Sequence, residues 1–359
     1  YGADGVPVSS SSQPAMMAIM AEQLGLAPGQ RVLEIGTGTG YNAAVLAHVV
    51  GPGGSVVTVD IESDLVARAR AGLAAAGYPE VRVSGADGGY GDPAGAPFDR
   101  IVVTAGAWDI APAWLEQLAP GGRLVLPLAV RGIQLSVGLD RRDGHWVSSS
   151  AFRCGFVRVL GAFADPESFR PVGETGVFAQ AADGRPADSA ALAAALAGPA
   201  ADLSTGVVMS SRDELGDLDF WLALAEPKLT RLAFIQASSG FRGSLLPLGG
   251  LAGRDGAGQD AAGPGSAGPY GVCGLVESGP DGGPPGAVAL RGYGPGGPGL
   301  AAYLAGRVRE WELAGRPGIA DLVLTVALRD PSAPPAAPAA GQVVFTRPHV
   351  QIAAGFRAS

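Results

Sequence analysis

The sequence predicts an α/β protein in which a doubly wound, Rossmann-like α/β/α sandwich is followed by a second, smaller α+β domain. Residues 31–50 read as a short apolar strand, a glycine-rich turn and a helix, which is the opening unit of this fold. Strand and helix patterns keep alternating to about residue 160, as is typical of a mostly parallel sheet. Beyond Gly161 the chain is rich in alanine, glycine and proline, and 359 residues fit two domains. We therefore expect domains at residues 1–160 and 161–359.

Three glycines spaced two residues apart follow the first strand. Because they lack a Cβ atom, Gly36, Gly38 and Gly40 allow a sharp backbone turn and let a ligand contact the main chain. The helix that begins at Tyr41 directs its free N–H groups toward the same ligand. The spacing differs from G-x-G-x-x-G, the dinucleotide-binding pattern, so it disfavours a dehydrogenase. The alternative to a ligand-binding turn is a loop that is rich in glycine but binds no ligand.

Polar residues follow the next strands at the same edge of the predicted sheet. Asp60 ends a short apolar strand 20 residues after Gly40, where a carboxylate can accept hydrogen bonds from both hydroxyls of a ribose. Asp87 and Gly88 follow the next strand and suit an adenine, although this pair is also common in ordinary turns. Thr104 ends a buried strand, and the small residues after it leave room for a substrate.

Periodicity, proline and glycine define the other elements of the first domain. Pro14 opens an amphipathic helix, because proline is tolerated in a first turn, and Ser12 or Gln13 is its cap. Two alternating segments that flank Gly144 predict a hairpin. The elements expected here are helices at residues 65–77 and 112–118 and strands at residues 123–127, 134–139 and 146–152.

The second domain carries weaker signals. Residues 240–298 are dominated by Gly, Pro, Ser and Ala, which predicts a flexible stretch of loops with short strands inside it. A clear helical pattern with one apolar face follows. The elements expected here are a helix at residues 300–314 and strands at residues 271–276, 287–290, 319–328, 342–345 and 349–353, the last two paired.

Composition excludes several classes of protein. The net charge of −8 argues against a nucleic-acid partner, which requires a basic face. Cys154 and Cys273 predict no disulfide framework, and three scattered histidines predict no zinc site. No apolar run is long enough to span a bilayer and no secretory signal is visible, so we expect a cytoplasmic protein without a membrane partner.

The pattern Glu34-x-Gly36-x-Gly38-x-Gly40 resembles motif I of class I S-adenosylmethionine (SAM) methyltransferases. With Ser12-Gln13-Pro14, residues 101–105 and residues 124–127, it makes roughly the first 155 residues similar to the protein-L-isoaspartate O-methyltransferase family. The resemblance implies a SAM-dependent enzyme that releases S-adenosylhomocysteine (SAH), needs no metal and acts on a peptide or protein bearing Asp or isoAsp. The cofactor contacts implied in this way are Glu34, Gly36, Thr37, Gly38, Gly40, Asp60, Ile61, Asp87, Gly88 and Thr104.

The resemblance also implies a catalytic role for Ser12, which matches the serine of the family's Ser-x-Pro motif. Taken alone, Ser12 reads as a helix cap. The family's Thr-Ala-Ala-Pro stretch is Thr-Ala-Gly-Ala at residues 104–107, and residues 161–359 have no counterpart in the repair enzyme.

The long C-terminal extension resembles that of homologues linked to ribosomally synthesised, modified peptides, where an aspartyl methyl ester closes to an aspartimide. We therefore favour peptide tailoring, with protein-L-isoaspartate repair as the alternative. A non-catalytic binding module is the alternative of another class. The extension is expected to recognise the substrate or to dimerise.

Overall fold

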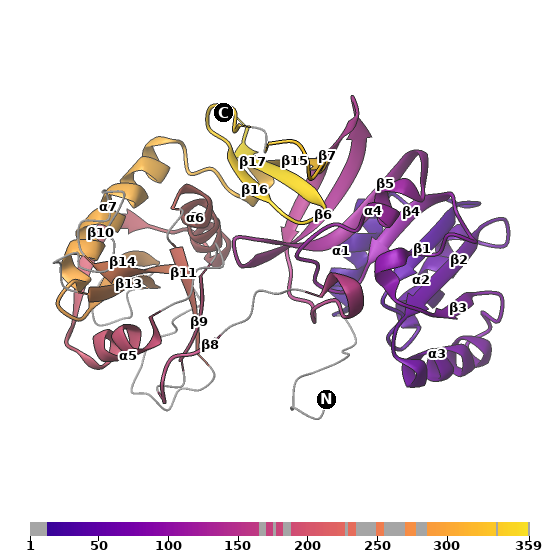
Figure 1. The fold of residues 1–359 in the computed structure, drawn as a ribbon, viewed down its shortest axis with the longest axis horizontal. Helices are drawn as coiled ribbons and strands as arrows, with labels where there is room; N and C mark the ends of the chain where they lie inside the picture. Colours follow the sequence, from indigo (N-terminus) through magenta and orange to yellow (C-terminus); the bar gives the residue numbers. More distant parts are fainter. Residues whose placement is uncertain are drawn as a thin grey trace. The chain divides into compact units, whose positions relative to one another are not determined.

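The computed structural model describes residues 13–164, 170–174, 177–181, 188–226, 229–234, 249–254, 270–277, 286–334 and 337–357. The chain divides into two compact units. Unit 1 comprises Tyr1–Pro166 and Ala320–Ala358, and unit 2 comprises essentially Glu167–Ile319. Figure 1 shows this discontinuity in colour, because the yellow C-terminal strands continue a sheet whose other strands are indigo to magenta.

Unit 1 is built on a ten-stranded mixed sheet with strand order β16-β17-β15-β7-β6-β5-β4-β1-β2-β3. The strands β1 to β5 are mutually parallel, and every further pairing, from β5–β6 to β16–β17, is antiparallel. The parallel strands are β1 (Arg31–Ile35), β2 (Ser55–Asp60), β3 (Arg82–Gly85), β4 (Phe98–Val103) and β5 (Leu118–Val130). The remaining strands are β6 (Ile133–Arg142), β7 (His145–Arg153), β15 (Leu322–Leu328), β16 (Val343–Thr346) and β17 (Val350–Phe356).

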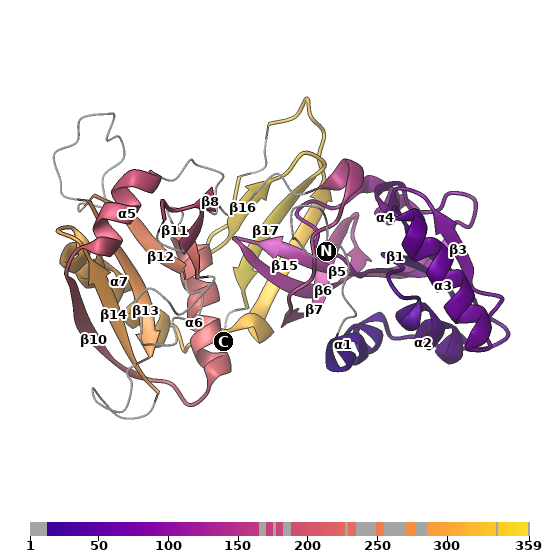
Figure 2. The same ribbon diagram turned by 90° about the horizontal axis from the view of Figure 1, so that it is seen from below.

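Three helices cover one face of this sheet: α1 (Pro14–Leu24), α2 (Tyr41–Val50) and α3 (Ser63–Ala75). Their apolar residues share one buried cluster with Val32, Val56 and Val125 from the strands. Figure 2 shows α1 and α2 next to each other on this side. The short helix α4 (Pro112–Glu116) and the 3-10 turns η1 (Gly88–Tyr90) and η2 (Gly161–Phe163) complete the unit. This arrangement confirms the α/β fold of the class I SAM methyltransferases.

The C-terminal strands differ from the expected domain division. Residues 1–160 were expected to form the first domain alone, whereas β15, β16 and β17 pair onto β7 and extend its sheet. Their sequences alternate with the period of a strand, so Leu324, Val326 and Ile352 are buried on one face. The pairing expected between residues 342–345 and 349–353 is confirmed by β16 and β17.

Two boundaries in unit 1 also differ from the sequence interpretation. The helix expected at residues 112–118 ends at Glu116, because Leu118 already pairs with Phe98. The strand expected at residues 123–127 is longer, and β5 runs from Leu118 to Val130 with an irregularity in its pairing to β4. The predicted hairpin is confirmed as β6 and β7.

Unit 2 contains an antiparallel seven-stranded sheet with strand order β10-β14-β13-β12-β11-β9-β8. Its strands are β8 (Arg170–Pro171), β9 (Val177–Ala181), β10 (Ala200–Val208), β11 (Leu229–Phe234), β12 (Gly249–Arg254), β13 (Tyr270–Glu277) and β14 (Ala287–Tyr293). Its helices are α5 (Ser189–Ala197), α6 (Arg212–Ala225) and α7 (Gly297–Leu313), and η4 (Ile319–Asp321) follows α7. An α+β architecture was therefore correctly expected.

Within the glycine-rich stretch at residues 240–298, which was expected to be flexible, residues 249–254, 270–277 and 286–298 are described and contain three strands, and the rest lies outside the described residues. The short strands expected at 271–276 and 287–290 are present as β13 and β14, and β12 is an additional strand that was not expected. Cys273 and Leu290 are fully buried in a core that also contains Trp311 of α7. A second buried cluster of unit 2 contains Val177 and Ala179 of β9, Leu192 of α5 and Tyr293 of β14.

Cys154 and Cys273 are both free cysteines. Among the described residues, none of the helices has the length and apolar character needed to cross a membrane.

The shared sheet leads to a prediction about unfolding. Leu324 lies in β15 and is fully buried, so Leu324→Ala should destabilise unit 1 by about 2–5 kcal/mol. In a thermal unfolding experiment it should lower the transition that SAM raises, because a ligand stabilises only the unit that binds it.

Leu304→Ala is the matched control, because Leu304 is equally buried but lies in the core of unit 2. It should lower the transition that SAM leaves unchanged. If Leu324→Ala affected only that second transition, the assignment of β15 to unit 1 would be wrong.

Candidate active site

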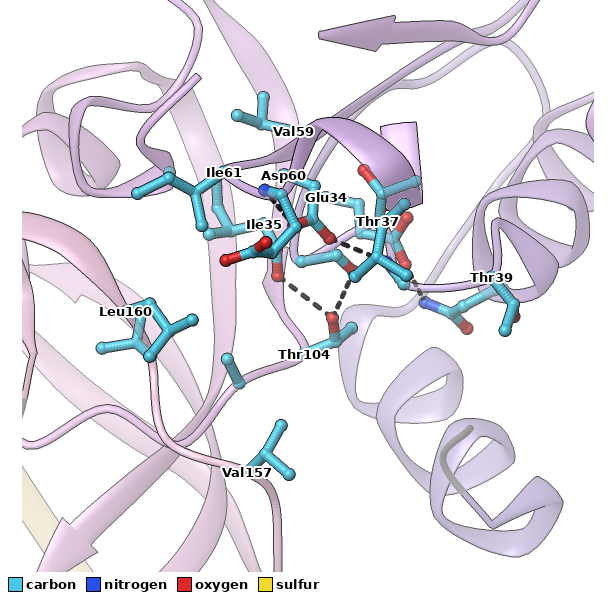
Figure 3. A pocket seen from close by; sticks show the side chains of 18 of the residues that line it. Glu34, Ile35, Thr37, Thr39, Val59, Asp60, Ile61, Thr104, Val157 and Leu160 are labelled. Atoms are coloured by element: carbon cyan, nitrogen blue, oxygen red, sulfur yellow. Dashed lines mark hydrogen bonds between the residues drawn. The ribbon is translucent and has the colours of Figure 1, made fainter. Parts of the chain in front are cut away.

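A pocket opens where β1, β2 and β4 end, on the edge of the sheet that the glycine turn follows (Figure 3). Of the ten residues expected to bind a cofactor, eight line it. These are Glu34, Gly36, Thr37, Gly38, Asp60, Ile61, Gly88 and Thr104. The carboxyl ends of parallel strands are where open α/β sheets bind their ligands.

The glycine turn needs its glycines for steric reasons. Gly36 has φ = 99°, and a Cβ atom there would lie 2.6 Å from Oγ1 of Thr104. This hydroxyl donates to the carbonyl oxygen of Gly36 at 2.7 Å, which ties the end of β4 to the turn after β1. Gly40 has a different role, because a Cβ atom would lie 3.3 Å from Ala69 and Leu73 of α3. Gly40 therefore allows α2 and α3 to pack closely and does not line the pocket.

Asp60 at the end of β2 is held in place by two backbone amides. Its Oδ2 accepts a hydrogen bond from the N–H of Gly38 at 2.9 Å, and its Oδ1 accepts one from Glu62 at 3.0 Å. Each carboxylate oxygen has a further lone pair, so the group can also accept from a ligand hydroxyl. Ile61 follows on the pocket wall and is 44% exposed, which offers an apolar surface to a flat ring.

Glu34 in β1 is a fully buried carboxyl group. It accepts hydrogen bonds from Asn42 Nδ2 and from Thr58 Oγ1, both at 2.7 Å, and Thr37 Oγ1 lies 2.8 Å from Thr58 Oγ1. Burial raises the pKa of Glu34 to about 7; the two hydrogen bonds oppose this shift and the nearby Asp60 carboxylate adds to it. Glu34 therefore changes its charge near neutral pH, at a site that a cationic ligand would approach.

Asp87 and Gly88 were both expected to contact the cofactor, but only Gly88 lines the pocket. Gly88 lines the pocket, and a Cβ atom there would lie 2.5 Å from Ile35. Asp87 does not line it, and its carboxylate accepts hydrogen bonds from the N–H groups of Gly89 and Ala162, both at 2.8 Å. In this structure Asp87 joins η1 to η2, and its expected contact with a cofactor stays a prediction.

One wall of the pocket is formed by residues that no sequence motif predicted. It consists of residues 157–160, with Val157 and Leu160 labelled in Figure 3. The N–H of Gly106 donates to the carbonyl oxygen of Val157 at 2.7 Å, so this wall is attached to the loop that follows β4. The only sequence signal was a short apolar run after the hairpin, which is too brief to suggest a site.

Ser12, the expected catalytic residue, lies outside the described residues. The helix that begins two residues later is described, and its Met17 lines the pocket. Gln13 is the helix cap without a side-chain hydrogen bond.

The fold and the pocket together define the class of the protein: it is a SAM-dependent methyltransferase of class I. The family model for protein-L-isoaspartate(D-aspartate) O-methyltransferase matches residues 5–163. The chain is 45% identical over 161 residues to the protein-L-isoaspartate O-methyltransferase of Methanopyrus kandleri, covering 44% of this chain and 71% of that protein. The chain therefore belongs to the protein-L-isoaspartate O-methyltransferase family.

Two solved structures also resemble the chain. A protein-L-isoaspartate O-methyltransferase aligns with 24% identity and a TM-score of 0.44, covering 90% of this chain and 80% of that chain. A Plasmodium falciparum structure titled as a putative member of the same family, in complex with SAH, aligns with 21% identity and a TM-score of 0.39, covering 45% and 78%.

The buried Glu34 predicts a pH dependence of stability. The folded protein keeps a proton on Glu34 up to about pH 7, whereas the unfolded chain loses it near the ordinary value of 4.5. Since the folded state binds the extra proton between these values, the contribution of Glu34 to stability falls as pH rises through this window, by about 3 kcal/mol in all. Glu34→Gln should remove this slope in urea unfolding of the ligand-free protein.

The exposed Glu80 provides the control, since Glu80→Gln should follow the wild type at every pH. An unchanged slope in Glu34→Gln would contradict the assignment of the raised pKa to this group.

Proposed function

We propose that this chain transfers a methyl group from SAM to the free carboxylate of an isoaspartyl residue in a peptide or protein. The observation that carries the proposal is the pocket at the glycine turn, with Asp60 anchored to Gly38, in a chain that belongs to this family. The repair type of activity is better supported by these relatives than peptide tailoring.

The residues of the pocket fit SAM. A Cβ atom at Gly36 or Gly88 would collide with Thr104 or Ile35, so both positions need glycine for this part of the pocket to keep its shape. Asp60 would accept hydrogen bonds from the ribose hydroxyls, and Ile61 would pack against the adenine. The N-terminus of α2 favours a carboxylate, as in the amino-acid part of the cofactor. An ionised Glu34 would favour its positive charges.

Methyl transfer to the substrate carboxylate requires alignment of the reacting groups more than acid–base catalysis. When bound, SAM supplies an electrophilic methyl group on a sulfonium centre. The substrate carboxylate is already ionised at neutral pH, so one of its oxygens forms the new bond to carbon without a general base. The carbon–sulfur bond breaks with its electron pair going to sulfur, and SAH leaves. Ser12 would donate a hydrogen bond that orients the carboxylate, and the site would exclude water.

The methyl ester then reacts within the substrate. The backbone nitrogen of the following residue attacks the ester carbonyl, a five-membered succinimide closes, and methanol leaves with the amide proton. This chemistry serves the repair of isoaspartate and, on an aspartyl side chain, the formation of an aspartimide. Tailoring of a ribosomally synthesised peptide is therefore the second candidate function, suggested by the region beyond residue 163, which the family model does not match.

Mass spectrometry with two matched peptides tests the proposal. The peptides share one sequence and differ only in carrying Asp or isoAsp at one position. Repair predicts a methyl-ester mass on the isoAsp peptide alone, followed by loss of methanol. Esterification of neither peptide would contradict methylation of these substrates and favour a non-catalytic module, whereas esterification of Asp alone would favour tailoring.

Unit 2 has no assigned role in this chemistry. We propose that it contacts the substrate or a second copy of the chain. Light scattering of the full chain tests the second role, because a dimer has twice the mass of the monomer.

The ribose assignment predicts a loss of cofactor affinity in Asp60→Asn. The variant keeps an acceptor for Gly38 but loses the charge that strengthens bonds from the ribose hydroxyls, so the Kd for SAM should rise about 10- to 100-fold. Isothermal titration calorimetry measures it.

Asp64→Asn is the control, because Asp64 is an exposed carboxylate in the first turn of α3. An unchanged Kd in Asp60→Asn would refute the ribose contact.

The orienting role predicts a different result for Ser12→Ala. Loss of one hydrogen bond to the acceptor carboxylate should lower kcat/KM for an isoaspartyl peptide by about tenfold or more, with the Kd for SAM unchanged. Ser11→Ala should behave like the wild type. If Ser11→Ala were instead the impaired variant, the catalytic serine would be the neighbouring residue.

A further inference from the structure

The pocket wall at residues 157–160 carries a positive charge that the cofactor contacts do not use. Arg158 is the single cationic side chain among the described residues that line the pocket. The lining carboxylates are Glu34, Asp60 and Glu62. Two of these have backbone or side-chain donors already, Glu34 from Asn42 and Thr58 and Asp60 from Gly38 and Glu62. The pocket is thus acidic on the glycine-turn side and basic on the wall that Arg158 belongs to.

The backbone of this wall is held on both sides. Gly106 donates to Val157 O at 2.7 Å and accepts from Val159 N–H at 3.0 Å, so Arg158 lies in a parallel bridge with Gly106. On the other side, Gln134 Oε1 accepts from Phe156 N–H at 2.7 Å. The Cα atom of Arg158 therefore has a fixed position relative to Thr104 and Ala105 at the end of β4. Arg158 is exposed and has a further interaction within the protein.

Two carboxylates enter this pocket during the proposed reaction, one on the amino-acid part of SAM and one on the acceptor. The first has a suitable partner in the N-terminus of α2, where Thr39, Tyr41 and Asn42 line the pocket. The wall that carries Arg158 lies across the pocket from this turn, as the positions of Val157 and Leu160 relative to Thr37 and Thr39 show in Figure 3. The acceptor carboxylate is thus the better match for Arg158.

We propose that Arg158 binds the acceptor carboxylate and selects substrates for their negative charge at this position; this inference rests on the proposed function. A guanidinium N–H donates to one carboxylate oxygen in a charge-assisted hydrogen bond, and the other oxygen keeps a lone pair for attack on the methyl carbon. The planar, pre-organised donors hold the carboxylate in one orientation, which favours an in-line displacement. A substrate carboxylate would share or replace the interaction that Arg158 makes within the protein.

Steady-state kinetics of the full chain test this role, with an isoaspartyl peptide and SAM varied in turn. Arg158→Gln should raise the KM for the peptide at least about tenfold while the KM and Kd for SAM stay within about twofold of wild type. Arg158→Lys should recover part of the loss, because it restores the charge but not the fork of donors. Arg153→Gln is the matched control, since Arg153 is an exposed arginine on β7 that does not line the pocket.

Each other outcome rejects a stated part of the inference. If Arg158→Gln raised the Kd for SAM and left the KM for the peptide unchanged, Arg158 would bind the carboxylate of the cofactor. If Arg158→Gln and Arg153→Gln both matched the wild type, Arg158 would have no role in binding. If the wild type methylated no isoaspartyl peptide, the proposed function would fail first and the inference would fall with it. Thermal unfolding of Arg158→Gln in the presence of SAM shows whether the variant is folded.

Discussion

The active site depends on one steric constraint at the end of β1. Gly36 lies so close to Thr104 that no side chain fits between them, and the Thr104 hydroxyl bonds to the carbonyl oxygens of Ile35 and Gly36. These contacts hold the ends of β1 and β4 at the same level. The turn can then direct the N–H of Gly38 to Asp60 at the end of β2. Three neighbouring strands thus present their functional groups to one pocket because one position lacks a Cβ atom.

A second set of contacts connects the C-terminal strands to this site. The turn between β16 and β17 carries His349, whose Nδ1 lies 2.8 Å from Oδ2 of the buried Asp109. The imidazole also packs against Phe163 of η2, with ring centroids 4.8 Å apart. Phe163 in turn lies against Gly89, where a Cβ atom would be 2.2 Å from its ring. Residues 320–358 therefore belong to the unit that holds the cofactor pocket, although they are separated from its other residues in the sequence by the whole of unit 2.

Several parts of the site were predictable because each follows from a local rule. Gly36, Gly38 and Asp60 stand at strand ends, and the strand ends of a parallel sheet meet at one edge. Asp87 was predicted by the same rule, yet it does not line the pocket, and its carboxylate joins η1 to η2 by accepting from the amides of Gly89 and Ala162. The partner Ala162 is 75 residues away in sequence, so no local pattern could indicate it. The place of Arg158 in the pocket has no local signal for the same reason, since it depends on pairing with Gly106.

The sequence by itself determined the strand–turn–helix unit at residues 31–50, the hairpin of β6 and β7, and the alternating apolar pattern of β15 and β17. Local periodicity and the conformational freedom of glycine are sufficient to specify such elements. Only the tertiary structure decided which sheet the last strands join and which residues besides the motif line the pocket. Those outcomes depend on hydrogen bonds and apolar burial between segments that are far apart in the chain. The free energy of folding that selects them comes from contacts that no short stretch of sequence contains.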